Sequence, residues 1–126
     1  MPKKHVVTPQ APRPIGPYSQ AVISGGLLFC SGQIGLDPQS GELVQGGIEA
    51  QTEQVLKNLV AVLKEAKMGP ENVVKTTVYL ADFGDFGKMN EVYGRQFAKD
   101  PPARTTIQAA ALPKGAKIEI DVIAAF

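Results

Sequence analysis

Apolar residues recur every three or four positions between residues 47 and 67, as on one side of an amphipathic helix. This stripe consists of Ile48, Val55, Leu56, Leu59, Val62, Leu63 and Ala66. Gly69 and Pro70 follow it, and such a pair ends a helix. A second helix is expected within residues 82–99, where Phe86, Met89, Tyr93 and Phe97 share one side. The pattern therefore predicts two helices, each with one apolar face.

The other apolar segments alternate and are rich in β-branched residues, which is typical of strands. A first short strand is predicted over residues 4–8. Two more are predicted within residues 21–35, joined at Gly25–Gly26, a dipeptide that favours a hairpin turn. Further strands are predicted over residues 72–81, 103–110 and 117–126. The expected order is β-β-β-α-β-α-β-β.

Two segments between these elements contain turn-forming or stiffening residues. Residues 8–20 hold four of the ten prolines, so this segment is expected to be extended and fixed rather than helical. Residues 36–43, with the sequence LDPQSGEL, combine Asp-Pro and Ser-Gly and predict a turn.

The order of the elements predicts one α+β domain over residues 1–126. Strand–helix–strand connections imply parallel pairing through right-handed crossovers, with both helices on one face of a mixed sheet. The other face then carries residues such as Tyr79, Ala81, Ile123 and Ala125. Apolar surface that a chain cannot cover is typical of a subunit interface, so we expect a homo-oligomer.

Composition disfavours several classes of function. The 13 basic and 12 acidic residues are scattered, which disfavours a nucleic-acid-binding surface. No apolar run has membrane-spanning length and no targeting segment is recognised, so a cytoplasmic location without membrane association is expected. Cys30 is the only cysteine and His5 the only histidine, which excludes an internal disulfide and disfavours a zinc site. We expect Cys30 to pack in the core and His5 to be solvated.

Reactive residues are sparse, and two charged side chains are candidates for a functional role. Arg104 follows the stiff sequence DPPA, and its planar guanidinium suits a carboxylate or phosphate, although an ordinary surface arginine fits the same pattern. Glu119 alternates with Ile118 and Ile120, which directs it toward the uncovered face. There it could form a salt bridge between subunits or take part in catalysis. The pattern alone leaves both questions open.

Several segments, taken together and in order, resemble the Rid family, also called the YjgF family, and most closely its RidA branch of reactive intermediate deaminases. They are IGPYSQA at 15–21, SGQIG at 31–35, MNEVYGRQF at 89–97, PPAR at 101–104 and LPKGAKIEIDVIA at 112–124. The resemblance implies a chorismate-mutase-like α+β fold and a homotrimer with ligand clefts between subunits. It also implies hydrolysis of 2-imino acids, formed from enamines such as 2-aminoacrylate, to 2-keto acids and ammonia. The expected substrates include 2-iminopropanoate and 2-iminobutanoate, and no metal or organic cofactor is expected.

The resemblance also implies roles for individual residues. Arg104 corresponds to the arginine that holds the substrate carboxylate, and Glu119 to the glutamate that orients or activates the attacking water. Further substrate-binding positions are Tyr18, Ser31, Gly32, Asn90 and Thr106. Thr106 stands where many bacterial members have a cysteine, so a function that depends on that thiol is not expected.

Other functions also fit the sequence. The same cleft could bind a small carboxylate in a non-catalytic or regulatory trimer. A ribonuclease or translation inhibitor is a second alternative, which the near-neutral charge disfavours. A chaperone-like or purely structural trimer is a third, and it would not depend on Arg104.

Overall fold

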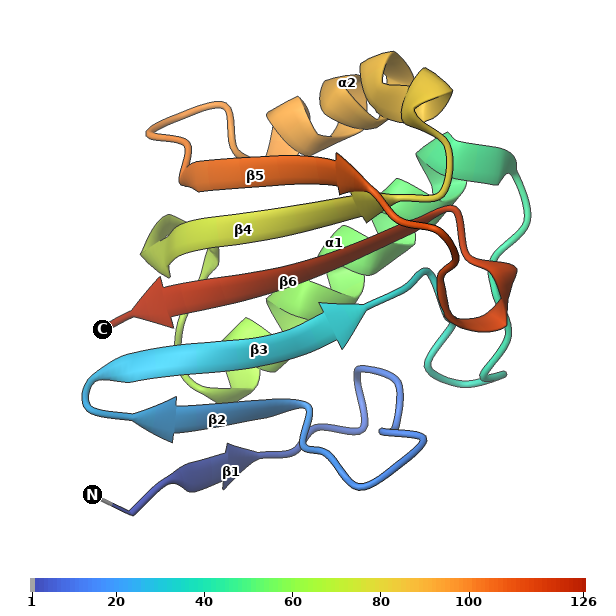
Figure 1. Ribbon diagram of the computed structural model, residues 1–126. Coiled ribbons are helices and arrows are strands. Elements are labelled where there is room, and N and C mark those ends of the chain that lie inside the picture. The colour runs from blue at the N-terminus through green and yellow to red at the C-terminus, as the bar shows by residue number, and fades with distance from the viewer. Residues whose placement is uncertain (1) are drawn as a thin grey trace.

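A six-stranded mixed sheet with two α-helices on one face makes up the protein, described for residues 2–126 by a computed structural model (Figure 1). The strands are β1 (Lys4–Val6), β2 (Ala21–Ser24), β3 (Leu27–Gln33), β4 (Val73–Leu80), β5 (Ala103–Gln108) and β6 (Ile118–Ala125). The helices are α1 (Gly47–Glu65) and α2 (Phe86–Gln96). In Figure 1, α1 lies behind the strands and α2 lies along the β5 edge. The predicted α+β class and order of elements are confirmed.

The strand order is β1-β2-β3-β6-β4-β5. Strands β4 and β5 are parallel neighbours connected through α2, as predicted. Strand β6 lies between β3 and β4 and runs antiparallel to both. The predicted direct pairing across α1 is therefore wrong, because the C-terminal strand occupies the central position between the two strands that α1 connects.

Local sequence signals place the turns and the helix ends. Gly25 and Gly26 have φ angles of 60° and 80° and form the tight β2–β3 hairpin, as predicted. The second helix begins at Phe86 rather than near residue 82. Asp82 accepts a hydrogen bond from the backbone N–H of Gly84 at 2.8 Å, and this bond stabilises a short 3₁₀ turn before α2.

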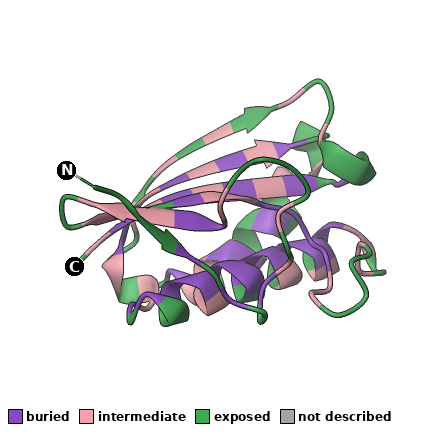
Figure 2. Ribbon diagram, turned by 90° about the horizontal axis from the view of Figure 1, so that it is seen from below, coloured by how far each residue is buried: buried purple, intermediate pink, exposed green. Residues whose placement is uncertain are grey.

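The core lies between the sheet and the helices (Figure 2). Along β6, Ile118, Ile120, Val122 and Ala124 are buried and alternate with half-buried residues. All seven residues of the predicted α1 stripe are buried against this layer. Cys30 is also in the core, as predicted, and burial raises the pKa of its thiol to about 12. A thiol with such a pKa is protonated at neutral pH and is a poor nucleophile.

No helix among residues 2–126 covers the other face of the sheet, which we call the bare face (Figure 2). Phe29 on β3 and Ile107 on β5 are each 44% exposed there. Their strand partners Ile123 and Tyr79 are half-buried on the same face. The predicted uncovered apolar surface is thus present.

The proline-rich segment is fixed by the buried side chain of Gln20. Its Oε1 accepts a hydrogen bond from the N–H of Thr8 at 2.7 Å. Its Nε2 donates to the carbonyl groups of Thr8, Ala11 and Pro12 at 3.0, 3.3 and 3.0 Å. The segment is therefore held in place, as predicted, but it bends around Gln20 instead of running straight.

Gln20→Glu tests how strongly this side chain fixes the segment. The substitution keeps the size of the side chain, removes its N–H donors and directs a carboxylate at backbone carbonyl groups. At neutral pH we expect the free energy of unfolding to fall by about 3 kcal/mol in urea denaturation. Gln39→Glu, at an exposed position, is the control and should change it by less than about 0.5 kcal/mol. Equal stability of the two variants would contradict the role of Gln20.

Candidate functional site

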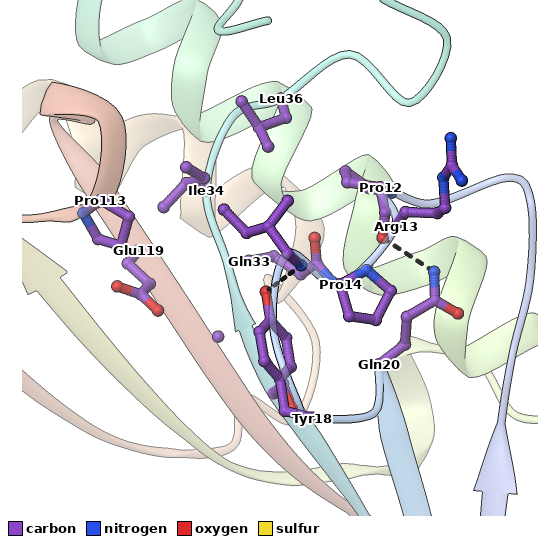
Figure 3. A pocket seen from close by; sticks show the side chains of 13 residues that line it. Pro12, Arg13, Pro14, Tyr18, Gln20, Gln33, Ile34, Leu36, Pro113 and Glu119 are labelled. Atoms are coloured by element: carbon purple, nitrogen blue, oxygen red, sulfur yellow. Dashed lines mark hydrogen bonds between the residues drawn. The ribbon is translucent and has the colours of Figure 1, made fainter. Parts of the chain in front are cut away.

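A cleft of about 510 Å³ opens between the proline-rich segment, the end of β3 and the start of β6 (Figure 3). It contains four of the predicted site residues: Tyr18, Ser31, Gly32 and Glu119. We call these four residues the glutamate half-site. Much of the remaining wall is apolar and includes Ile15, Ile34, Leu36 and Pro113.

Glu119 is half-buried and projects from β6 on the bare face, as its alternation predicted. Gly32 makes room for it, because a Cβ atom at position 32 would collide with the carboxylate of Glu119. Burial raises the pKa of Glu119, and the negative charge of Asp121 on the same face raises it further. A carboxylate with a raised pKa is better suited to accept a proton from water than an ordinary glutamate.

Hydrogen bonds hold the opposite side of the cleft. The Tyr18 hydroxyl accepts a hydrogen bond from the N–H of Ile15 at 3.3 Å, and its ring faces Glu119 across the cleft (Figure 3). Ser31 donates a hydrogen bond from its Oγ to the carbonyl of Ser19 at 2.6 Å. The first contact is internal to the proline-rich segment, and the second joins this segment to β3, so this side of the cleft is anchored to the sheet.

Three other predicted residues, Asn90, Arg104 and Thr106, come from α2 and β5, and we call them the arginine half-site. The Nη1 of Arg104 donates a hydrogen bond to Oδ1 of Asn90 at 2.7 Å. Thr106 lies two residues beyond Arg104 on β5 and therefore shares its side of the strand. The half-site combines a cation with neutral polar groups, which is suitable for binding a small carboxylate.

The two half-sites lie on opposite faces of the sheet. Arg104 is the strand partner of Thr76, which is buried on the helix side and bonded to Tyr93 of α2. Glu119 is the strand partner of Tyr79, which lies on the bare face. One chain therefore does not bring Arg104 and Glu119 together around a small molecule.

The other arginine near the cleft does not replace Arg104 in this chain. Arg13 is exposed, and its guanidinium points away from Glu119 (Figure 3). Among the residues that line the cleft, no cation is thus directed toward Glu119.

Sequence reasoning missed the apolar wall of the cleft and the surroundings of Arg104. Ile34 lies within the recognised SGQIG segment, but the pattern did not distinguish it from a core residue. Phe86 and Tyr93 were assigned only to the helix core, yet their rings lie 5.5 and 4.8 Å from Cζ of Arg104. The spacing of Phe86, Asn90 and Tyr93, at steps of four and three, places them on one side of α2 and could have revealed this.

Within residues 2–126, no group of three or more histidine, cysteine, aspartate or glutamate residues is arranged to hold a metal ion. None of the helices in this range combines the length and the apolar character that crossing a membrane requires. His5 is exposed on β1, as expected, and lies outside both half-sites.

Comparison with known proteins agrees with the fold and the motifs. The family described as Endoribonuclease L-PSP matches residues 8–126. A rat protein named 2-iminobutanoate/2-iminopropanoate deaminase is 52% identical over 122 residues, which cover 97% of this chain and 89% of the rat protein.

Solved structures extend the agreement to three dimensions. A putative endoribonuclease from Thermotoga maritima is 48% identical, with a TM-score of 0.95 over 98% of this chain and 97% of that one. E. coli TdcF with bound serine is 38% identical, with a TM-score of 0.93 over 98% of each chain. Because the family match spans nearly the whole sequence, the chain belongs to the endoribonuclease L-PSP family, the Rid or YjgF family that its motifs indicated.

Proposed function

We propose that this protein hydrolyses reactive 2-imino acids, such as 2-iminopropanoate and 2-iminobutanoate, to 2-keto acids and ammonia. The observation that carries the proposal is a half-buried carboxylate of raised pKa, Glu119, facing an open cleft. A separate arginine half-site provides a cation for the substrate carboxylate. The name of the 52% identical rat relative, which specifies these two substrates, supports the same reaction.

The active site is completed between copies of the chain. Arg104 and Glu119 lie on opposite faces of the sheet, so a substrate small enough to touch both needs them from different copies. The exposed Phe29 and Ile107 on the bare face provide apolar surface for such an association. A homotrimer, as the family resemblance implies, would close into a ring with one arginine half-site beside one glutamate half-site at each interface.

The reaction needs few groups. Arg104 holds the substrate carboxylate and thereby fixes the position of C2, while Thr106 and Asn90 border the bound molecule. Glu119 takes a proton from a water molecule as the water oxygen bonds to C2 of the protonated imine, which forms a carbinolamine. The C–N bond then breaks, the hydroxyl proton is lost to give the keto acid, and Glu119 returns its proton to the leaving ammonia. A single general base contributes about 10²–10⁴-fold, which suffices for an imine that also hydrolyses slowly in water.

The direct test is an assay in which a pyridoxal-phosphate enzyme generates 2-aminoacrylate or 2-aminocrotonate and the keto acid is followed over time. We expect the protein to accelerate the appearance of pyruvate or 2-oxobutanoate. Unchanged rates would reject the proposed function. Carboxylate binding without acceleration would indicate the regulatory alternative, and salt-dependent RNA cleavage would indicate a ribonuclease.

Gly32→Ala tests whether the position of the Glu119 carboxylate matters. The new methyl group would displace this flexible carboxylate, so we expect kcat to fall by about 100-fold. Melting temperature should change little, since the side chain of Glu119 can rotate away. Gly87→Ala, at an exposed position of α2 with open space around the new Cβ, is the matched control and should retain wild-type kcat. A wild-type kcat in Gly32→Ala would contradict the proposed role of Glu119.

The pH dependence of kcat/KM tests the environment of Glu119. A general base must be ionised, so activity should fall as pH decreases through the raised pKa of Glu119. Asp121→Asn removes a negative charge that contributes to this raised pKa, so we expect the acid limb of the profile to move to lower pH. Tyr79→Phe is the control, because it removes a 2.9 Å hydrogen bond to Asp121 but leaves the charge. An acid limb that stays in place in Asp121→Asn would argue against Glu119 as the base.

A further inference from the structure

The guanidinium of Arg104 lies close to two aromatic rings of α2. Its Cζ is 5.5 Å from the centre of the Phe86 ring and 4.8 Å from the centre of the Tyr93 ring. Phe86 and Tyr93 are seven residues apart, which is two helical turns or about 10.5 Å along the axis. A side chain from the neighbouring strand can therefore contact both rings at once.

Each of the two rings makes a further contact with a neighbouring side chain. The Tyr93 hydroxyl is bonded to Oγ1 of Thr76 at 2.7 Å, and both residues are buried. Burial raises the pKa of Tyr93, so this hydroxyl stays protonated at neutral pH. The ring of Phe86 stacks on that of Phe83 with centres 5.2 Å apart and planes inclined by 13°. Each ring beside Arg104 is therefore held by a contact of its own.

This environment restricts how a ligand can reach Arg104. Both rings lie within cation–π distance of the guanidinium, and Asn90 already accepts a hydrogen bond from Nη1. Asn90 and the rings are neutral, so these contacts leave the positive charge uncompensated. The remaining N–H groups of the guanidinium lie in its plane and are available to an anion, which is the geometry of bidentate carboxylate binding.

We propose that Tyr93 and Phe86 are positioning residues, which hold the Arg104 guanidinium in a fixed plane so that it receives the substrate carboxylate edge-on. The inference rests on the proposed function and adds residues that act through Arg104 without touching the substrate. A cation held in its binding geometry loses less conformational entropy when the ligand arrives, so the rings increase affinity for the carboxylate.

The test compares removal of the ring with loss of stability alone. Tyr93→Leu removes the ring but keeps an apolar side chain, and Tyr93→Phe restores the ring without the hydroxyl. Val92→Ala, at a buried neighbouring position of α2 outside the stack, is the control for a weakened helix. For each variant, Kd for 2-oxobutanoate is measured by calorimetry, kcat and KM by the imine assay, and melting temperature by circular dichroism.

We expect Tyr93→Leu to raise Kd and KM by about five- to tenfold with a smaller change in kcat. Tyr93→Phe should recover most of this affinity although it loses the bond to Thr76, and Val92→Ala should lower the melting temperature without changing Kd. A wild-type Kd in Tyr93→Leu, or an equal loss in Val92→Ala, would overturn the inference. Wild-type protein that does not bind 2-oxobutanoate would overturn it as well.

Ligand binding and imine turnover are measured separately, so the positioning role and the deaminase function can be rejected independently of each other. Protein that binds 2-oxobutanoate in a ring-dependent manner but does not accelerate imine hydrolysis would support the positioning role and reject the deaminase function. If the protein hydrolyses imines but Tyr93→Leu leaves Kd unchanged, the deaminase function would be supported and the positioning role rejected.

Discussion

The alternation of side chains across the sheet decides what a single chain can do. Successive residues of a strand point to opposite faces, and no side-chain rotation changes this. Arg104 is the strand partner of Thr76 on the helix-covered face, whereas Glu119 is the strand partner of Tyr79 on the bare face. A shift of one residue in the β4–β5 register would move Arg104 to the bare face. With the observed register, a site that uses both residues requires two copies of the chain.

The same separation gives each group an environment that suits its proposed role. Glu119 lies beside Gly32 and Asp121 in a half-buried cleft, and this environment raises its pKa. Arg104 lies close to two aromatic rings, which are neutral and leave its positive charge in place. If both were adjacent in one chain, they would form an ion pair, which would lower the pKa of the glutamate and occupy the arginine. Within a single chain the two groups therefore do not neutralise each other.

The sequence predicted features that depend on local pattern. The α1 stripe, the Gly25–Gly26 hairpin and the direction of Glu119 follow from periodicities of 3.6 and 2 and from glycine's tolerance of positive φ. Features that depend on strand order were not accessible, because local pattern does not say which strands are neighbours. Thus the insertion of β6 between β3 and β4 was missed, and so was the face occupied by Arg104, which depends on how β5 registers with β4.

The central claim, that each active site combines residues of two copies, can be measured by mixing inactive variants. Arg104→Ala and Glu119→Gln would each be expressed and purified alone, and the two would also be co-expressed and purified together. Imine hydrolysis would then be compared among these three samples and the wild-type protein. Random mixing in equal amounts places an intact arginine beside an intact glutamate at about a quarter of the interfaces. We therefore expect about a quarter of wild-type activity from the co-expressed protein. Activity no higher than that of the separate variants, in oligomers verified to contain both, would contradict the shared site.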